Sequence, residues 1–254
     1  MIREMEIKRL HIGTSGWSYN HWNGVFYPPE VKPAQYLEYY QTWFDCVELN
    51  SSFYHLPKKM TASGWMDRTP ENFRFCPKMS RFITHQRRLL YAEEALQNFF
   101  DVFDVMSTRV GPVLIQLPPG LHYDLPRLSD FLNYLCEHYP EYRFAIEVRH
   151  ESLLRDEFFD LLRQNNMAFV IADSGRRYPS AELVTADFVY LRFHGNVKLY
   201  ATDYRFDELE EYAAKIRNWA NEGKEVWAFF NNDFEGYAVK NAVELKNILT
   251  TDQR

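Results

Sequence analysis

Short runs rich in β-branched and aromatic residues alternate with helix-length amphipathic segments along the whole chain. Each of eight such runs predicts a strand: His11–Trp17, Cys46–Tyr54, Phe73–Met79, Val113–Pro118, Phe144–His150, Ala168–Ser174, Phe188–Gly195 and Glu225–Asp233. A strict alternation of strands and helices predicts a parallel sheet, because the chain must cross back before it can start the next parallel strand.

The segments between most of these runs have apolar residues at helical spacing. Pro33 and Pro126 stand where two of them begin, a position at which proline is well tolerated. Two further segments, Lys58–Arg68 and Ala181–Ala186, fit either short helices or loops. The predicted helices are Ala34–Phe44, Ala95–Met106, Arg127–His138, Asp156–Gln164, Asp207–Ala220 and Tyr237–Leu249.

Three features favour a sheet that closes on itself over an open sheet covered on both faces. There are eight units, no glycine-rich phosphate loop follows a strand, and no change of composition marks a second domain. The length of 254 residues is also close to the roughly 250 residues typical of such barrels. We therefore predict a single closed (β/α)8 barrel of TIM type with parallel strands, forming one domain over residues 1–254.

The charge pattern limits the partners of the chain. Its formal net charge is −6 and its 29 Lys and Arg residues are scattered, so we expect no extensive contact with nucleic acid. No run approaches the roughly 18 apolar residues of a membrane span. The charged segment Met1–Leu10 lacks the apolar core of a secretory signal. We expect a cytoplasmic protein that does not bind membranes.

Alternate residues of a strand point to opposite faces of the sheet, and here this separates an apolar set from a polar set. Within Phe144–His150, Ile146 and Val148 share one face while Glu147 and Arg149 share the other. We expect the apolar face to pack against outer helices and the polar face to point at the barrel axis. The polar positions late in their strands are Glu48, Asn50, Lys78, Gln116, Glu147, Arg149, Asp173, Arg192, His194 and Asn231, followed by Asn232 at a loop junction.

Catalytic and ligand-binding groups of barrels gather at the carboxyl ends of the strands, so these residues predict a polar pocket there. If it is an active site, Glu48→Gln and Glu147→Gln are expected to change the melting temperature little while weakening function. An alternative stays open, because three cations and three carboxylates could neutralise one another in an ion network that plugs the barrel: Lys78, Arg149, Arg192, Glu48, Glu147 and Asp173.

Aromatic side chains crowd the loops expected above this polar floor. Trp17 and Tyr19 stand at the first loop, and Tyr54 stands at the end of the second predicted strand. Rings beside directional hydrogen-bonding groups suit a sugar-like or other ring-bearing ligand. The chain is 17% aromatic throughout, so these rings could equally serve to pack the loops.

Seven segments carry a family pattern in a single order: Gly13–Tyr19, Val47–Tyr54, Ile83–His85, Gln116–Pro119, Glu147–His150, Arg192–Gly195 and Phe230–Asp233. Together they resemble the YecE-like proteins, a bacterial family named for domain of unknown function 72. The resemblance covers nearly the whole chain and implies a TIM-type barrel, but it implies no activity. Leu153 follows Ser152 where the family commonly has an aromatic residue, which puts a ring contact there in doubt.

The first functional hypothesis is an enzyme that acts on a small polar, carbohydrate-like or anionic substrate, as a hydrolase or by lyase or isomerase chemistry. Glu48 and Glu147 are its acid/base or nucleophilic pair, with Lys78 and His194 as further catalytic candidates. Lys78 could form a Schiff base if burial lowered its pKa, or it could be a charge-paired structural lysine. The substrate-binding candidates are Trp17, Tyr19, Asn50, Tyr54, His85, Gln116, Arg149, Asp173, Arg192, Asn231 and Asn232.

Lys78, Arg149 and Arg192 could together hold a phosphate or carboxylate group, so we expect such anions to bind in the pocket. A second hypothesis is a non-catalytic protein that holds a small ligand, or a few single-stranded bases stacked on the aromatic loops. A third is a metal-dependent hydrolase, which no HExxH or comparable spacing supports; its ligands would come from His55, His85, His150, His194, Glu48, Glu147 and Asp173. We assign no metal site and expect no cofactor.

Overall fold

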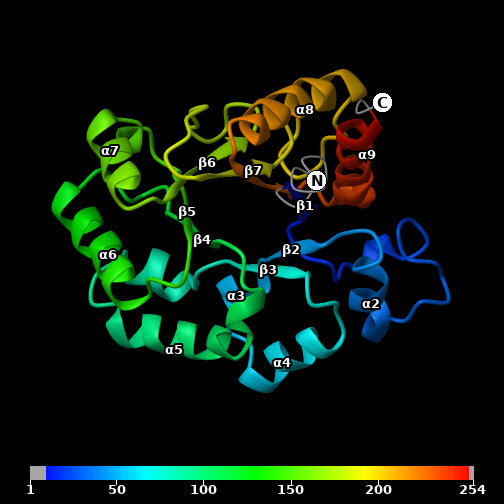
Figure 1. The fold of residues 1–254 in the computed structure, drawn as a ribbon, viewed down its shortest axis with the longest axis horizontal. Coiled ribbons are helices and arrows are strands. Elements are labelled where there is room, and N and C mark those ends of the chain that lie inside the picture. The colour runs from blue at the N-terminus through cyan, green and yellow to red at the C-terminus, as the bar shows by residue number, and fades with distance from the viewer. Residues whose placement is uncertain (1–9, 252–254) are drawn as a thin grey trace.

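The computed structural model describes residues 10–251. Within this range each of the eight predicted runs overlaps a strand, which ends before its predicted limit; β1 begins one residue before its run, at Leu10. Lys78, Arg149 and His194 therefore lie just beyond the ends of their strands. The strands are β1 Leu10–Thr14, β2 Cys46–Leu49, β3 Arg74–Pro77, β4 Val113–Gln116, β5 Phe144–Glu147, β6 Ala168–Asp173, β7 Phe188–Phe193 and β8 Glu225–Phe230 (Figure 1).

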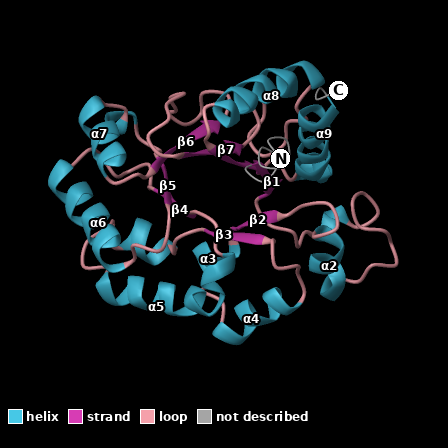
Figure 2. Ribbon diagram, in the orientation of Figure 1, coloured by secondary structure: helices cyan, strands magenta, loops and turns pink. Residues whose placement is uncertain are grey.

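The prediction of a single closed eight-stranded barrel is wrong. Six strands form one curled parallel sheet in the order β1-β8-β7-β6-β5-β4, a half-barrel, while β2 and β3 form a separate parallel pair (Figure 2). The α/β class and the parallel direction of the strands are as predicted. The same finding corrects the TIM-type barrel that the family resemblance implied.

A tyrosine side chain occupies the junction between β1 and β2. The Tyr40 hydroxyl accepts a hydrogen bond from the Thr14 backbone N–H at 2.9 Å and donates one to the Cys46 carbonyl at 3.1 Å. In a continuous sheet such backbone groups would bond to those of the neighbouring strand. Gly13 allows the strands to approach, because a Cβ there would lie 2.4 Å from the Cys46 carbonyl oxygen. The tyrosine thus replaces the ladder at this junction.

The junction between β3 and β4 is interrupted for a different reason. Two isolated parallel bridges join this edge, one between Phe75 and Val110 and one between Lys78 and Leu114. The bridges are three residues apart on the β3 side and four apart on the β4 side, so the register changes between them. Pro77 in addition lacks the N–H that a ladder requires. The edge is therefore held at two points without a continuous ladder.

Helices surround the strands (Figures 1 and 2). A helix overlaps each of the six predicted helical segments, and α7 has the predicted bounds. Lys58–Arg68 contains α4, whereas Ala181–Ala186 contains neither helix nor strand. The helices are α2 Tyr36–Tyr40, α3 Ser51–Tyr54, α4 Lys59–Asp67, α5 Glu93–Phe103, α6 Leu125–His138, α7 Asp156–Gln164, α8 Phe206–Asn221 and α9 Tyr237–Thr251.

The short helix α3 replaces the end of the second predicted strand and helps to position Lys78. The Ser52 hydroxyl lies 2.7 Å from the carbonyl oxygens of both Leu49 and Lys78. It also accepts a hydrogen bond from the Lys78 backbone N–H at 3.1 Å. These contacts tie α3 to the carboxyl ends of β2 and β3, where backbone groups of a turning chain need partners.

The two faces of the strands divide as the alternation predicts. Ile146, Val148, Leu191 and Phe193 belong to the large core cluster, which includes buried residues of α5 to α9. The opposite face forms a smaller inner cluster in which small side chains lie beside large rings. Its members include Cys46, Cys76, Leu114, Ala145, Ala168, Val170, Ala172, Tyr190, Trp227 and Phe229. This inner cluster forms an apolar floor beneath the polar groups at the carboxyl ends of the strands.

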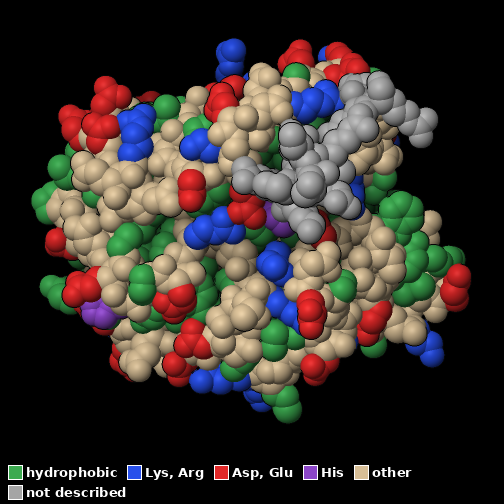
Figure 3. Space-filling model, in the orientation of Figure 1, with side chains coloured by type: hydrophobic (Ala, Val, Ile, Leu, Met, Phe, Trp, Pro, Cys, Tyr) green, Lys and Arg blue, Asp and Glu red, His purple; other side chains and the backbone are tan. Residues whose placement is uncertain are grey.

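None of the helices within residues 10–251 has both the length and the apolar character needed to span a bilayer. On the face seen in Figure 3, basic and acidic side chains are interspersed. This mixture corresponds to the scatter of charged residues along the sequence.

We predict that Tyr40→Phe destabilises the fold by about 1–3 kcal/mol, because Thr14 N–H and the Cys46 carbonyl lose their shared partner. Denaturant unfolding measures this change. Tyr39→Phe is the matched control, since Tyr39 precedes Tyr40 on α2, is half-buried and has no hydrogen bond from its hydroxyl within residues 10–251. Equal losses in the two variants would mean that the Tyr40 hydroxyl does not bridge the strands.

Candidate functional site

Glu48 and Arg192 form a buried ion pair at the carboxyl ends of β2 and β7. Arg192 donates to the carboxylate from Nη2 to Oε1 at 2.7 Å and from Nε to Oε2 at 2.9 Å. The hydroxyls of Ser15 and Tyr190 donate to the same two oxygens at 2.7 and 2.9 Å. Glu48 is 0% exposed, and with four donors around it no edge of the carboxylate is free for a substrate.

Glu147 connects this pair to the other polar groups. Its Oε2 accepts from Arg192 Nη1 at 2.5 Å, while its Oε1 lies 2.7 Å from His194 Nε2 and 2.9 Å from Arg149 Nη2. Burial alone would raise the pKa of Glu147, but the charges of Arg192 and Arg149 outweigh burial and hold this pKa well below its usual range. Glu147 is therefore an ionised carboxylate with three partners.

His194 is held as a neutral imidazole. The side-chain nitrogen of Asn231 donates to Nδ1 at 3.0 Å, so Nδ1 is the acceptor and Nε2–H donates to Glu147. Burial lowers the pKa of His194 to about 4. One tautomer is thus fixed from both sides of the ring.

Arg149 and Lys78 are cations with few hydrogen-bond acceptors around them. Arg149 Nη2 and Lys78 Nζ both donate to Gln116 Oε1, at 3.1 and 2.9 Å. Arg149 Nε and Nη1 are buried and have no hydrogen-bond partner within residues 10–251. Lys78 makes no ion pair with a carboxylate in that range, and its Nζ lies 4.3 Å from the centre of the Phe53 ring. One amide oxygen therefore serves two buried cations.

The surroundings of Lys78 disfavour its charged form. Burial, and next the positive charge of Arg192, lower the pKa of Lys78 to about 7. Neutral amine and ammonium are therefore both populated at neutral pH. The residue is 8% exposed, so it is buried but retains some contact with solvent.

Two half-buried side chains flank these cations. The Tyr178 ring stacks on the Arg149 guanidinium, whose carbon lies 3.5 Å from the ring centre. His85 packs edge-on against Phe53, with ring centres 5.0 Å apart. Burial, and next the charge of Lys78, lower the pKa of His85 to about 4. Rings and a neutral imidazole therefore border the two cations.

Two of the predicted substrate-binding residues lie outside this cluster. Asp173 Oδ2 accepts from the Tyr212 hydroxyl on α8 at 3.0 Å. It points to the helices because Ala172 occupies the inner face of β6, so the expectation that Asp173 faces inward is wrong. Asn232 Nδ2 donates to Asn241 Oδ1 on α9 at 2.9 Å, which ties a loop to that helix.

The predicted aromatic candidates lie to one side of the cluster. Trp17, Tyr19 and Asn50 line a hollow of about 330 Å³ that also includes Ser15, a partner of Glu48. Tyr54 is 69% exposed and lines no part of it. The hollow has flat walls that a ring could contact, but its lining includes none of the three buried cations.

The candidate metal ligands do not converge. Within residues 10–251 no group of three or more His, Cys, Asp and Glu side chains is arranged to hold a metal ion. His55 is exposed, and the His150 ring stacks on His122 with centres 3.9 Å apart. The hypothesis of a metal-dependent hydrolase therefore has no ligand set in the described part of the chain.

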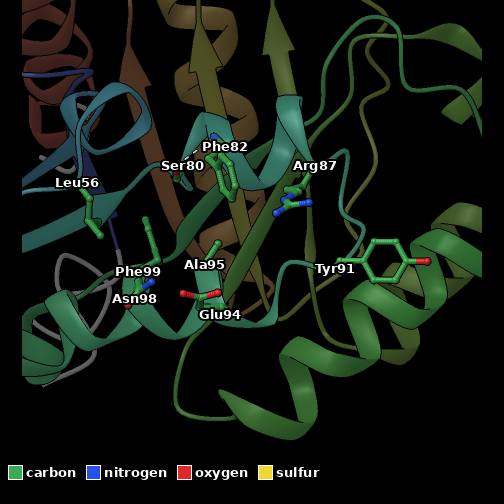
Figure 4. Close-up of a pocket in the computed structure, with 9 residues that line it drawn as sticks. All are labelled: Leu56, Ser80, Phe82, Arg87, Tyr91, Glu94, Ala95, Asn98 and Phe99. Carbon is green, nitrogen blue, oxygen red and sulfur yellow. Dashed lines mark hydrogen bonds between the residues drawn. The ribbon is translucent and has the colours of Figure 1, made fainter.

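A further hollow, of about 290 Å³, lies between the segment after β3 and helix α5. Figure 4 shows Ser80, Phe82 and Arg87 from that segment around it, together with residues of α5. Its lining includes neither Lys78 nor Arg149. This hollow is therefore distinct from the cluster of buried ions.

Three contributors to the cluster are not among the candidates selected from the sequence. Ser15 and Tyr190 donate to Glu48, and Tyr178 covers Arg149. Tyr190 shares a strand face with Arg192, so the alternation could have identified it. Ser15 and Tyr178 lie in irregular segments, where no periodicity indicates the direction of a side chain.

The sequence matches a known protein family. The model of a family described as "Protein of unknown function DUF72" matches residues 11–254. The chain belongs to the DUF72 family. The UPF0759 protein YecE of Escherichia coli (strain K12) is 32% identical to this DUF72 protein over 142 residues, which are 56% of this chain and about half (48%) of YecE. The UPF0759 protein YunF of Bacillus subtilis (strain 168) is 24% identical over 94% of both chains.

Solved structures of DUF72 proteins share the fold. One from Thermotoga maritima MSB8 has a TM-score of 0.85 and 31% identity, covering 94% of this chain and 98% of that one. Another, from Enterococcus faecalis V583, has a TM-score of 0.81 and 22% identity, covering 94% and 95%. The Thermotoga maritima structure supports both the family and the fold, and the Enterococcus faecalis structure supports the fold alone. DUF72 membership assigns no activity.

We predict that Glu48→Gln lowers the free energy of unfolding by about 3–5 kcal/mol, because Arg192 stays buried and loses a charged acceptor. This prediction replaces the expectation from the sequence that Glu48→Gln changes the melting temperature little. Glu38→Gln is the control: its pair with Arg68 is partly exposed, and its loss should stay below about 1 kcal/mol. Denaturant melts compare the two variants, and a small effect at Glu48 would contradict the structural role of the pair.

We predict that Lys78→Met stabilises the protein at pH 7 and that this gain shrinks as the pH rises. The folded-state pKa of Lys78 is lowered from 10.5 to about 7, so between these values the unfolded wild type binds more protons and folding stability rises with pH. Melts between pH 7 and 10 measure the difference, with the exposed Lys59→Met as control. A difference in stability between wild type and Lys78→Met that does not change with pH would contradict the lowered pKa of Lys78.

Proposed function

We propose that the protein is an enzyme that binds a small anionic compound at the carboxyl ends of β3, β4 and β5 and acts on it with Lys78 as its acid/base group. The observation that carries the proposal is the buried Arg149 side chain, whose Nε and Nη1 have no hydrogen-bond partner within residues 10–251. Burying donors without acceptors is costly, and a ligand anion would supply the acceptors.

The charges of the cluster favour an anion. Lys78, Arg149 and Arg192 are buried with two carboxylates, those of Glu48 and Glu147, which leaves one positive charge in excess when Lys78 is protonated. All three nitrogens of Arg192 already contact glutamate oxygens. Arg149 and Lys78 are therefore the cations available to a carboxylate or phosphate group.

Lys78 is better suited to proton transfer than the two glutamates. A group with a pKa of about 7 can both accept and release a proton at neutral pH. The oxygens of Glu48 and Glu147 are occupied by donors, so we assign these two side chains the role of holding Arg192 and Arg149 in position. Gln116 would orient Lys78 beside the bound anion.

Anion binding is tested by thermal melts at constant ionic strength. Phosphate, sulfate or pyruvate at millimolar concentration should raise the melting temperature of the wild type relative to chloride, because each binds the folded state. The shift should be lost in Arg149→Gln. It should persist in Arg143→Gln, because Arg143 pairs with Glu225 where β8 begins, at the amino ends of the strands. A wild type that no anion stabilises would contradict the proposal.

Catalysis is tested separately from binding. The protein is incubated with a mixture of small anionic metabolites, and consumption and product formation are followed by mass spectrometry. We expect turnover that is lost in Lys78→Met and kept in Lys59→Met. A ligand that is retained but never converted would instead assign a non-catalytic binding protein.

A further inference from the structure

We infer that Lys78 is a nucleophile that forms an imine with a small carbonyl compound bearing a carboxylate or phosphate group. The inference rests on the proposed anion site at Arg149 and deepens it by naming the substrate class and the covalent step.

The environment of the Lys78 amine differs from that of a structural lysine. Among the lysines within residues 10–251, Lys78 alone is buried. Lys59, Lys215 and Lys240 pair with carboxylates at the surface. The Lys78 amine instead has a single amide acceptor, on Gln116, and lies over an aromatic ring. An amine removed from water without a counter-ion is costly to charge, which favours the neutral nucleophile.

Arg149 and Lys78 lie close enough to share one hydrogen-bond acceptor. Arg149 and Lys78 lie on two sides of one oxygen, Gln116 Oε1. In the proposed complex the anionic group binds Arg149, and a carbonyl carbon one or two bonds away faces Lys78 Nζ. The rings of Phe53 and Tyr178 lie against the two cations, which adds apolar surface beside the proposed site.

The chemical step balances without a further reactant. The neutral Lys78 amine adds to the carbonyl carbon, and the resulting carbinolamine loses its oxygen as water. The two hydrogens of the amine leave with that oxygen, so a C=N bond replaces the C=O bond. The lowered pKa of Lys78 provides neutral amine at pH 7. As water leaves, the nitrogen first carries positive charge as an iminium, until its second hydrogen departs as a proton. This charge lies next to the anionic group of the substrate itself.

Reductive trapping tests the inference on the wild-type protein. The protein is treated with sodium cyanoborohydride and one of three probes: pyruvate, which carries a carboxylate, dihydroxyacetone phosphate, which carries a phosphate, and uncharged dihydroxyacetone. Peptide mapping by mass spectrometry then locates the reduced adduct. We expect labelling at Lys78 with one or both anionic probes, at least about tenfold faster than with dihydroxyacetone, which is the scale of one charged hydrogen bond. The more reactive anionic probe identifies the group that the site accepts.

Variants and pH give independent controls. Lys78→Arg keeps the positive charge but should abolish the adduct at this position. Arg149→Gln should remove the preference for anionic probes, whereas Arg143→Gln should keep it. Labelling of Lys78 should rise as the pH passes about 7, while labelling of exposed lysines rises near their ordinary pKa of about 10.4.

The outcomes separate this inference from the proposed function. Anions that stabilise the wild type, with no adduct at Lys78 or with labels spread over surface lysines, would overturn the imine and leave the anion site standing. Absence of both stabilisation and labelling would overturn both. Equal labelling of Lys78 by all three probes would overturn the anionic substrate class.

Discussion

The buried ion pair between Glu48 and Arg192 is the interaction on which the rest of the cluster depends. Glu48 belongs to the separate β2–β3 pair, while Arg192 and its neighbour Tyr190 belong to the six-stranded sheet. Their hydrogen bonds therefore join the two sheets across the interior, although the backbone ladder is interrupted at both junctions. Removing charges from water is unfavourable, so the pair is stable only because each oxygen of Glu48 receives two donors.

Saturation of Arg192 determines which groups of the cluster keep unused hydrogen-bonding capacity. Both glutamates direct oxygens at its guanidinium, and Glu147 divides its remaining acceptor capacity between His194 and Arg149. Within residues 10–251, two side-chain nitrogens of Arg149 have no hydrogen-bond partner, and Lys78 has no carboxylate partner. The same ion network thus has a structural part around Arg192 and an unsatisfied part at Arg149 and Lys78. Sequence reasoning posed an active site and a plug as alternatives. The geometry supports a structural ion network around Arg192, and the active site is our proposal for Arg149 and Lys78.

The alternation of side chains predicted much of this cluster. It brought together Glu48, Glu147, Arg192 and His194, because residues two apart on a strand share a face whatever the rest of the fold does. It failed at Asp173, where the pattern does not reveal which face is inner. The inner face of β6 consists of small apolar residues such as Ala172, so a late polar residue is not by itself a sign of the interior. The alternation also could not predict which charges pair with each other, because a two-residue period gives no distances between residues of different strands.

The sequence by itself determined the elements: the locations of the strands, their separation by helices and hence their parallel direction, and the division into apolar and polar faces. These properties depend on neighbouring residues, and their physical causes act over a few positions. Only the tertiary structure decided where the sheet is interrupted. Tyr40 inserts its hydroxyl between strands at Thr14 and Cys46, and the register changes between β3 and β4. Both depend on contacts between distant segments. So does the outcome that Arg149 shares Glu147 with Arg192 while Lys78 pairs with no carboxylate within residues 10–251, because ion pairs form only when the strands that carry the charges meet.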